Sequence, residues 1–197
     1  MKKIGLVDFG SVGNIYSIKN AVLNSGNQCI VIDSAKKLNS VSRVILPGVG
    51  SFHEAMTELK DSGFAEQLNA FDGPILGICL GMQMLSKIGF EGGKTNGLNL
   101  IDAEVKKIHC NSPIPHMGFN KINVINKSGL LNDIEQEEFY FMHSYELINF
   151  TNITSLSEYG DHTFVSSVEK DNIYGVQFHP EKSRYAGIKL FENFSNL

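Results

Sequence analysis

The sequence lacks several features that would point to particular classes of protein. It has no tryptophan, five prolines and three cysteines in 197 residues. The odd number and wide spacing of the cysteines fit neither a disulfide framework nor a CxxC metal site, so we expect a reducing, cytoplasmic location. No stretch approaches the roughly 18 apolar residues of a membrane span, and the apolar run before Asp8 is too short for a signal peptide.

Charge and composition narrow the set of partners. The net charge is −4, and no run of Lys or Arg is long enough to follow a phosphate backbone, which argues against nucleic acid. The histidines, cysteines and acidic residues do not stand at metal-ligand spacing. A hydrophobic fraction of 42% and a charged fraction of 19% are ordinary for a globular protein. We therefore expect one domain over residues 1–197, with small-molecule and protein ligands and with no metal or cofactor.

The first half of the chain alternates short apolar runs with amphipathic ones. Short strands that are apolar on both faces and alternate with helices favour an open α/β sheet of mostly parallel strands. Ligands bind such sheets beyond the carboxyl ends of the strands. The predicted strands are 4–8, 28–33, 43–46 and 74–79, and the predicted helices are 14–24, 52–60 and 80–87.

The second half has a different pattern, because its apolar runs have few helical intervals between them. We expect these runs to be partly antiparallel strands that extend or flank the same sheet, followed by a closing helix over 185–194. The predicted strands are 104–108, 121–125, 139–143, 163–169 and 173–178.

Cys79 stands between Gly77 and Gly81, where an apolar run ends and an amphipathic run begins. This is the spacing of a nucleophile elbow with cysteine in place of serine, because a sharp strand-to-helix turn needs small neighbours. A position at the start of the following helix favours thiolate over thiol. A buried structural cysteine fits the same residues, so this segment alone leaves both interpretations open.

A second segment, 175–183, ends an apolar strand at His179 and has Glu181 two positions further on. Pro180 fixes the turn, so Glu181 can accept a hydrogen bond from one ring nitrogen of His179 while the other nitrogen faces Cys79. A cysteine nucleophile needs such a base and such an orienting group. Taken alone, the segment favours a partly exposed strand-end histidine and a solvated turn carboxylate over a catalytic pair.

A third segment, Pro47-Gly48-Val49-Gly50, ends the third predicted strand. Its backbone N–H groups, together with the amide of Leu80, can form an oxyanion hole over an acyl carbon bound to the cysteine. A plain turn with glycines for geometry is the alternative. Three such segments at strand ends together favour a cysteine-histidine-glutamate site.

The segments PGVGSF (47–52), GICLGMQ (77–83) and GVQFHPEKS (175–183) resemble the class I glutamine amidotransferases, and the resemblance extends over nearly the whole chain. With 114–120 and 140–145, it is most similar to the glutaminase subunit of imidazole glycerol phosphate synthase. The resemblance implies a three-layer, flavodoxin-like α/β fold with an antiparallel extension. It also implies hydrolysis of L-glutamine to glutamate and ammonia through a cysteine thioester.

The resemblance also assigns roles to individual residues. Cys79 attacks the side-chain amide of glutamine, His179 moves the proton, and Glu181 orients His179. His143 is expected to be a structural or substrate-side group, and His116 to lie near the partner interface. The other implied positions are Val49, Gly50 and Leu80 for the oxyanion hole, Gln83, Ser144 and Tyr145 for substrate binding, and Asn14, Phe119, Asn120, Tyr140 and Lys182 for the partner interface.

The implied partner is a (β/α)₈-barrel cyclase. As a heterodimer with this chain, it would use the ammonia to form imidazole glycerol phosphate and an aminoimidazole carboxamide ribotide in histidine biosynthesis. Phe119 stands where the family usually has tryptophan, and Phe9 where tyrosine is commoner. These departures leave a paralogous client open, an enzyme that builds nitrogen-containing surface sugars. A catalytically silent flavodoxin-like binding protein is a further alternative, against which Gln83 and the triad residues speak.

Overall fold

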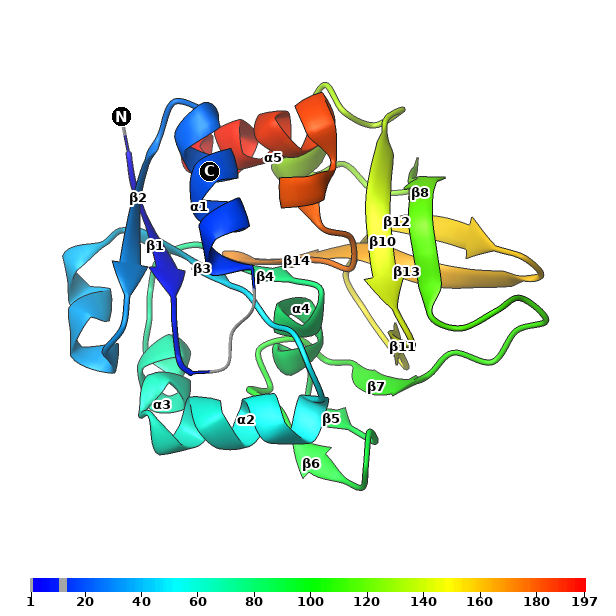
Figure 1. Ribbon diagram of the computed structural model, residues 1–197, viewed down its shortest axis with the longest axis horizontal. Helices are drawn as coiled ribbons and strands as arrows, with labels where there is room; N and C mark the ends of the chain where they lie inside the picture. The colour runs from blue at the N-terminus through cyan, green and yellow to red at the C-terminus, as the bar shows by residue number, and fades with distance from the viewer. Residues whose placement is uncertain (1, 11–13) are drawn as a thin grey trace.

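The fold is built around an eight-stranded sheet (Figure 1). The computed structural model describes residues 2–10 and 14–197. In spatial order the strands are β2 (Gln28–Ile32), β1 (Lys3–Val7), β3 (Arg43–Leu46), β4 (Ile75–Ile78), β14 (Ile173–Val176), β13 (His162–Lys170), β12 (Ile153–Tyr159) and β9 (Asn123–Val124). The first five are parallel and the last three continue the sheet in antiparallel fashion, which confirms the predicted mixed sheet.

Helices cover both faces of the parallel part of this sheet. Helices α1 (Ile15–Asn24) and α5 (Arg184–Asn196) lie on one face, and α2 (Phe52–Asp61), α3 (Phe64–Asn69) and α4 (Leu80–Met84) on the other (Figure 1). Strand β3 shows why its residues read as one apolar run: Val44 and Leu46 enter one core and Ile45 the other. Three 3₁₀ turns complete the helical elements of the described ranges, η1 (Ala35–Ser40), η2 (Gly129–Leu131) and η3 (Pro180–Lys182).

Two smaller sheets flank the antiparallel end. Strands β8 (His116–Lys121) and β10 (Glu138–His143) pair antiparallel as a separate two-stranded unit, called here the β8–β10 ribbon. The other sheet has the order β11 (Tyr145–Ile148), β7 (Glu104–Lys107), β5 (Ile88–Gly89) and β6 (Thr95–Asn96). The sequence pattern predicted β7 and β10 but not β5, β6, β8, β11 or β12, and the strand predicted over 121–125 shrinks to the two residues of β9.

The helix after Cys79 is also shorter than predicted, since α4 ends at Met84 rather than at residue 87. The backbone amides of the following loop occupy the carbonyls that a longer helix would need. Leu98 N donates to Met84 O at 2.9 Å, and Leu100 N donates to Leu85 O at 2.9 Å. These hydrogen bonds from the loop therefore end the helix, and no residue within the helix itself signals its end.

Candidate active site

The turn between β4 and α4 places Cys79 in a backbone conformation that side-chain-bearing residues rarely adopt, with φ 53° and ψ −109°. The residues two positions before and after it are glycines because the backbone segments touch. A Cβ atom on Gly77 would lie 2.7 Å from the backbone of Gly81, and one on Gly81 would lie 1.9 Å from the carbonyl oxygen of Leu46. The structure therefore forms the sharp turn that the two glycines predict, with Cys79 at its apex.

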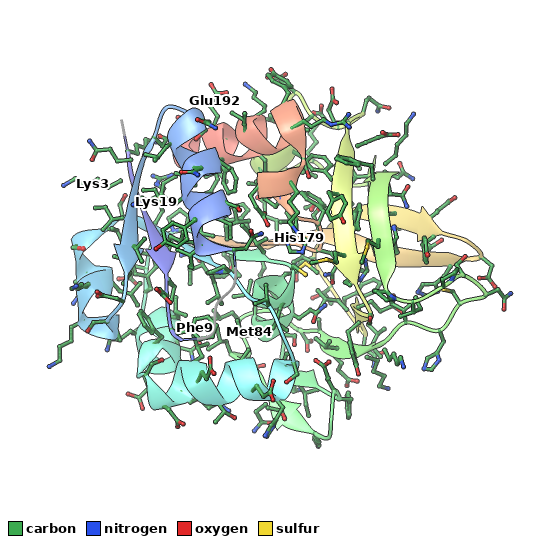
Figure 2. The ribbon with its side chains drawn as sticks, viewed as in Figure 1. Lys3, Phe9, Lys19, Met84, His179 and Glu192 are labelled. Carbon is green, nitrogen blue, oxygen red and sulfur yellow. The ribbon has the colours of Figure 1, made fainter. Side chains whose placement is uncertain are left out.

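His179 and Glu181 reach the same end of the sheet on the neighbouring strand. Strand β14 pairs in parallel with β4, with Val176 opposite Ile78, and His179 lies just beyond β14. The Nδ1 atom of His179 lies 2.8 Å from Oε1 of Glu181, and the two side chains are 3% and 0% exposed. Figure 2 labels His179 beside the β8–β10 ribbon, where its backbone N donates to Tyr140 O at 2.8 Å.

The electrostatics of this group favour a charged imidazole. Burial lowers the pKa of His179, but the proximity and charge of Cys79 and the hydrogen bond and charge of Glu181 outweigh burial and raise it to about 10. The Nε2 atom of His179 is buried and has no hydrogen-bond partner among the described residues, yet it is close enough to Cys79 for the thiol to affect the pKa. This nitrogen is therefore free to exchange a proton with a group bound at Cys79.

These residues open onto a cavity of about 230 Å³. It is smaller than the roughly 300–1,000 Å³ that hold drug-sized ligands, so it suits a small substrate. Glu181 lies behind His179 and does not reach the cavity. The predicted site residues that line it are Cys79, His179, Val49, Gly50, Leu80, Gln83, Ser144 and Tyr145.

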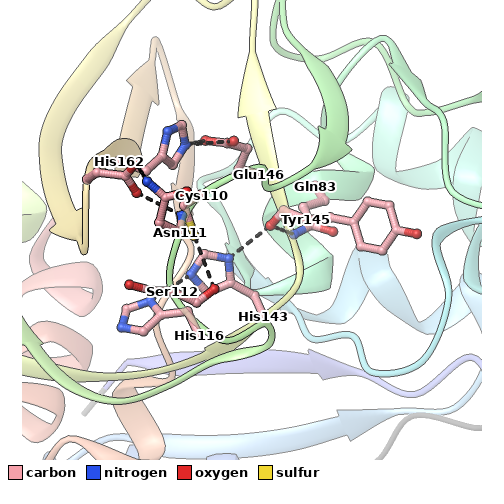
Figure 3. Close-up of polar contacts among 10 residues, drawn as sticks. Gln83, Cys110, Asn111, Ser112, His116, His143, Tyr145, Glu146 and His162 are labelled. Carbon is pink, nitrogen blue, oxygen red and sulfur yellow. Dashed lines mark hydrogen bonds and ion pairs between the residues drawn. The ribbon is translucent and has the colours of Figure 1, made fainter.

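Gln83 lines the cavity, but its amide nitrogen is already bonded within the protein. The Nε2 atom donates to Tyr145 O and to Oε1 of Gln177, both at 3.0 Å. Figure 3 shows Gln83 and His143 converging on the Tyr145 carbonyl, to which Nδ1 of His143 comes within 2.9 Å. Gln83 therefore holds the wall of the cavity together, in addition to the substrate role that the resemblance implies.

His116, which was expected near the partner interface, is 3% exposed and so is not itself a surface residue. Its ring stacks on Tyr159 at 4.1 Å and on Phe141 at 5.1 Å, and its Nδ1 lies 3.3 Å from Nε2 of His143. Burial lowers the pKa of His116 to about 4 and that of His143 to about 3, so both rings are neutral near pH 7.

Glu91 is a cavity residue that the sequence did not single out. It lies on the loop after β5, and its Oε2 accepts a hydrogen bond from the backbone N of Phe52 at 2.7 Å. The loop is glycine-rich and polar, so no local pattern separates this carboxylate from a solvated one. Only the packing of the loop against the start of α2 brings it to the cavity.

Three of the predicted interface residues form or border the outer face of the β8–β10 ribbon. Phe119 lies opposite Tyr140 in the strand register, with ring centroids 5.5 Å apart. Lys182 Nζ lies 5.4 Å from the Tyr140 ring centre, and the Arg184 guanidinium 4.7 Å from that of Phe119. Phe119 is 41% exposed. Asn120, a fourth predicted interface residue, points to the opposite face and donates to the carbonyl oxygen of Glu158.

Asn14, the fifth predicted interface residue, lies against the triad. Its Nδ2 donates a hydrogen bond to Oε1 of Glu181, the oxygen that also faces His179. The structure therefore gives this asparagine a contact within the chain, at the carboxylate that holds the histidine.

Two features are absent from the described part of the chain. Across residues 2–10 and 14–197, no helix combines the length and apolar character needed to cross a membrane. The same ranges contain no group of three or more His, Cys, Asp or Glu side chains placed to hold a metal ion.

Comparison with known proteins is consistent with this geometry. Residues 6–196 match the family Glutamine amidotransferase class-I. The chain is 42% identical over 202 residues to imidazole glycerol phosphate synthase subunit HisH 1 of Campylobacter jejuni, covering 98% of this chain and 100% of that one. It is 43% identical over 200 residues to subunit HisH 2 of Methanococcus maripaludis, covering 97% and 98%.

Solved structures share the fold at lower identity. A GMP synthase chain of Thermoplasma acidophilum superposes with a TM-score of 0.77 at 22% identity, covering 100% of this chain and 93% of that chain. PurLQS of Thermotoga maritima superposes with a TM-score of 0.74 at 17% identity, covering 100% and 99%. At these identities the likeness concerns the fold alone.

Proposed function

Because the chain belongs to the class I glutamine amidotransferases, we propose that it is the glutaminase subunit of an imidazole glycerol phosphate synthase in histidine biosynthesis. One observation carries the proposal: two adjacent parallel strands bring Cys79 and His179 to one cavity, and Glu181 is paired with His179 behind it. The HisH relatives that match nearly the whole chain support the choice of pathway. We expect the chain to act in the cytoplasm as one domain over residues 1–197.

In the first half of the reaction, the Cys79 thiolate attacks the side-chain amide carbon of glutamine. The carbonyl oxygen gains negative charge, which backbone N–H groups of the oxyanion loop at Val49 and Gly50, together with that of Leu80, would stabilise. His179, charged at neutral pH, gives its Nε2 proton to the leaving nitrogen. Ammonia departs and a γ-glutamyl thioester remains on the sulfur.

In the second half, His179 is neutral after giving up its proton and can take one from water. The hydroxide formed attacks the thioester, the sulfur leaves as thiolate, and glutamate is released. Glu181 accepts from Nδ1 throughout, which keeps Nε2 turned toward the cavity and stabilises the charged ring. The proton that His179 gives up in the first half is thus replaced in the second.

The amino-acid end of glutamine needs groups that recognise an ammonium and a carboxylate. Glu91 is the carboxylate of the cavity and is suited to the ammonium. Ser144 and Tyr145, at the end of β10 and the start of β11, supply hydroxyl and backbone groups for the substrate carboxylate. Gln83 completes this wall through its bond to the Tyr145 carbonyl.

The ammonia acceptor is proposed to be a (β/α)₈-barrel cyclase that binds the outer face of the β8–β10 ribbon. Phe119 and Tyr140 give this face an aromatic centre, and Lys182 and Arg184 give it positive charge at the rim. Aromatic residues and arginine are enriched at the centres of protein interfaces. Tyr140 also links this face to the site, because its carbonyl accepts from the backbone N of His179.

The test replaces the nucleophile in the complex of this chain with the cyclase. We expect Cys79→Ala to lower glutamine-dependent product formation by at least about a thousandfold and to leave the reaction with ammonium salts intact. Both activities are followed by product formation at saturating cyclase substrate. Cys29→Ala is the matched control, because burial raises the pKa of that thiol to about 11 and it lies outside the cavity.

Retention of glutamine-dependent activity in Cys79→Ala would refute the mechanism, and loss of both activities would indicate that the variant has collapsed. If the chain binds and feeds a sugar-modifying enzyme but not the cyclase, the pathway is refuted while the glutaminase chemistry stays in place.

A further inference from the structure

Gln177 is a fully buried polar residue at the nucleophile, and no sequence pattern assigned it a role. It follows β14, two residues before His179, and its side chain is 0% exposed. Its Nε2 lies 3.6 Å from the Sγ atom of Cys79, and its Oε1 accepts from Nε2 of Gln83 at 3.0 Å. A buried amide this close to the sulfur can change the relative stability of its thiol and thiolate forms.

The orientation of this amide is fixed by a chain of hydrogen bonds that starts at a backbone carbonyl. The carbonyl oxygen of Tyr145 can only accept, so the side chain of Gln83 must turn its NH₂ group toward it. The same NH₂ group donates to Gln177, so the side-chain oxygen of Gln177 must face Gln83. The remaining end of the Gln177 amide, its NH₂ group, is thereby directed at the sulfur.

His143 strengthens the starting point of this chain. Its Nδ1 lies 2.9 Å from the same Tyr145 carbonyl and must carry the proton in that contact, because the carbonyl can only accept. Its Nε2 then accepts from Nδ1 of His116 at 3.3 Å. Figure 3 shows His143 between His116 and the Tyr145 carbonyl. The donor at the sulfur is therefore held by groups from three separate strands and one helix.

The surroundings of Sγ differ in what they offer the two protonation states. The thiol can donate to the carbonyl oxygen of Met142 at 3.8 Å, a contact that the thiolate cannot use. The NH₂ group of Gln177 can only donate, so it favours the thiolate. We propose that Gln177 is a further catalytic residue, whose side-chain amide donates a hydrogen bond to the Cys79 thiolate and stabilises it for attack.

The Gln177 amide does not titrate, but several titratable groups also face Cys79. His179 comes from the turn after β14 with Glu181 behind it, His143 comes from β10, and Tyr145 and Glu91 share the cavity. His143 is neutral at the pH of activity because burial lowers its pKa to about 3. Gln177 does not titrate, so its stabilisation of the thiolate is the same at every pH, whereas that of His179 ends when its ring loses the proton.

The proposal rests on Cys79 being the nucleophile, but its test needs neither glutamine nor a partner. The rate of iodoacetamide alkylation at Cys79 is measured against pH on the full chain. The modified peptide is quantified by mass spectrometry, because Cys29 and Cys110 are free thiols as well. The midpoint of this profile reports the thiol pKa directly, whether or not the chain hydrolyses glutamine.

Two variants remove the donor. Gln177→Met keeps the length of the side chain and cannot donate, and we expect its midpoint to rise by about one pH unit, a roughly tenfold lower rate below the midpoint. Gln177→Glu keeps the shape and places a carboxylate at the sulfur, so we expect a larger rise. Thermal melts identify a variant that fails to fold, in which case the other variant decides.

Ser166→Ala is the matched control. Ser166 is buried, and its carbonyl accepts from the backbone N of Gln177 at 2.9 Å. Its hydroxyl forms a hydrogen bond with the hydroxyl of Ser155, not with the sulfur of Cys79. We expect its alkylation midpoint to match that of the unmodified chain. Unchanged midpoints in both Gln177 variants, or an equal shift in Ser166→Ala, would overturn the proposal and leave Gln177 as a packing residue.

Discussion

The elbow at Cys79 and the β8–β10 ribbon border the same cavity, but they are held in different ways. At the elbow, backbone touches backbone: the position of a Cβ atom on Gly77 or Gly81 is already occupied by main-chain atoms. On the ribbon, side chains divide by strand alternation, with Phe139 and Phe141 buried inward and Phe119 exposed outward. The geometry at Cys79 is therefore fixed by contacts that admit no added atom, whereas the proposed docking surface uses exchangeable side chains.

The largest effect on stability is expected when a side chain is added at a glycine of the elbow. In Gly81→Ala the added Cβ would lie 1.9 Å from the carbonyl oxygen of Leu46, so β3 or α4 must move. We expect the free energy of unfolding to fall by about 3 kcal/mol or more, with loss of glutaminase activity, as measured by urea denaturation and glutamate release.

Gly92→Ala provides the control for this substitution. Its φ is +68° and nothing lies within 4 Å of the added Cβ, so it should cost only about 1 kcal/mol for the left-handed backbone. If both substitutions lowered the free energy of unfolding equally, steric contact at the elbow would not account for the loss at Gly81.

An intermediate effect on stability is expected when the pH is lowered, because two buried histidines lie on the inner face of the ribbon. Burial lowers the pKa of His116 to about 4 and that of His143 to about 3, against about 6.5 when unfolded. Below pH 6.5 the unfolded chain therefore binds more protons, and stability falls as the pH drops toward 4. His179 adds no slope well below pH 6.5, because its raised pKa leaves it protonated in both states there.

We expect the free energy of unfolding to fall by about 1 kcal/mol per pH unit for each of the two histidines between pH 6 and 5. Urea denaturation at a series of pH values measures the slope. A stability that does not vary between pH 6.5 and 4.5 would contradict the neutral buried pair.

The smallest effect on stability is expected on the outer face of the ribbon. Phe119→Ala should change the free energy of unfolding by less than about 1 kcal/mol, because the ring is 41% exposed. Its affinity for the cyclase should fall by roughly thirtyfold, the effect of a central aromatic contact worth about 2 kcal/mol. Urea denaturation and titration calorimetry separate the two quantities.

The chain contains a close match for Phe119 elsewhere on its surface. Phe90 is 39% exposed and has Lys106 Nζ 5.1 Å from its ring centre, much as Phe119 has Arg184. Phe90→Ala should leave the affinity for the cyclase unchanged. Equal losses of affinity in the two variants would argue against the ribbon as the docking surface.

The sequence pattern identifies most readily the strands that are buried on both faces, and the strands of the ribbon are harder to identify. Strands β1, β3 and β4 are buried mostly on both faces, so each reads as an apolar run that ends near a turn. Strand β8 reverses the usual alternation, with His116 inward and Met117 and Phe119 outward. With only these two apolar residues in six positions, β8 contains no apolar run, so the sequence does not mark it as a strand.

The candidate site divides in a similar way. Cys79, His179 and Glu181 could be found from local spacing, because each stands at or just after the end of an apolar run beside glycine or proline. Glu91 and Gln177 could not, since their roles depend on which distant segments pack against them. Gln83 was found for its substrate role, but its bonds to Tyr145 and Gln177 depend on segments 62 and 94 residues away.

The pairing of β14 with β4 also decides when a new chain becomes able to react. Cys79 and Gln177 are 98 residues apart, and His179 lies further still along the chain. During synthesis the thiol therefore emerges long before its proposed base, and a loop of about a hundred residues must close before the two meet. An unfinished chain on the ribosome carries the cysteine without the histidine, so under the proposed mechanism it releases no ammonia before there is a folded surface to receive a partner.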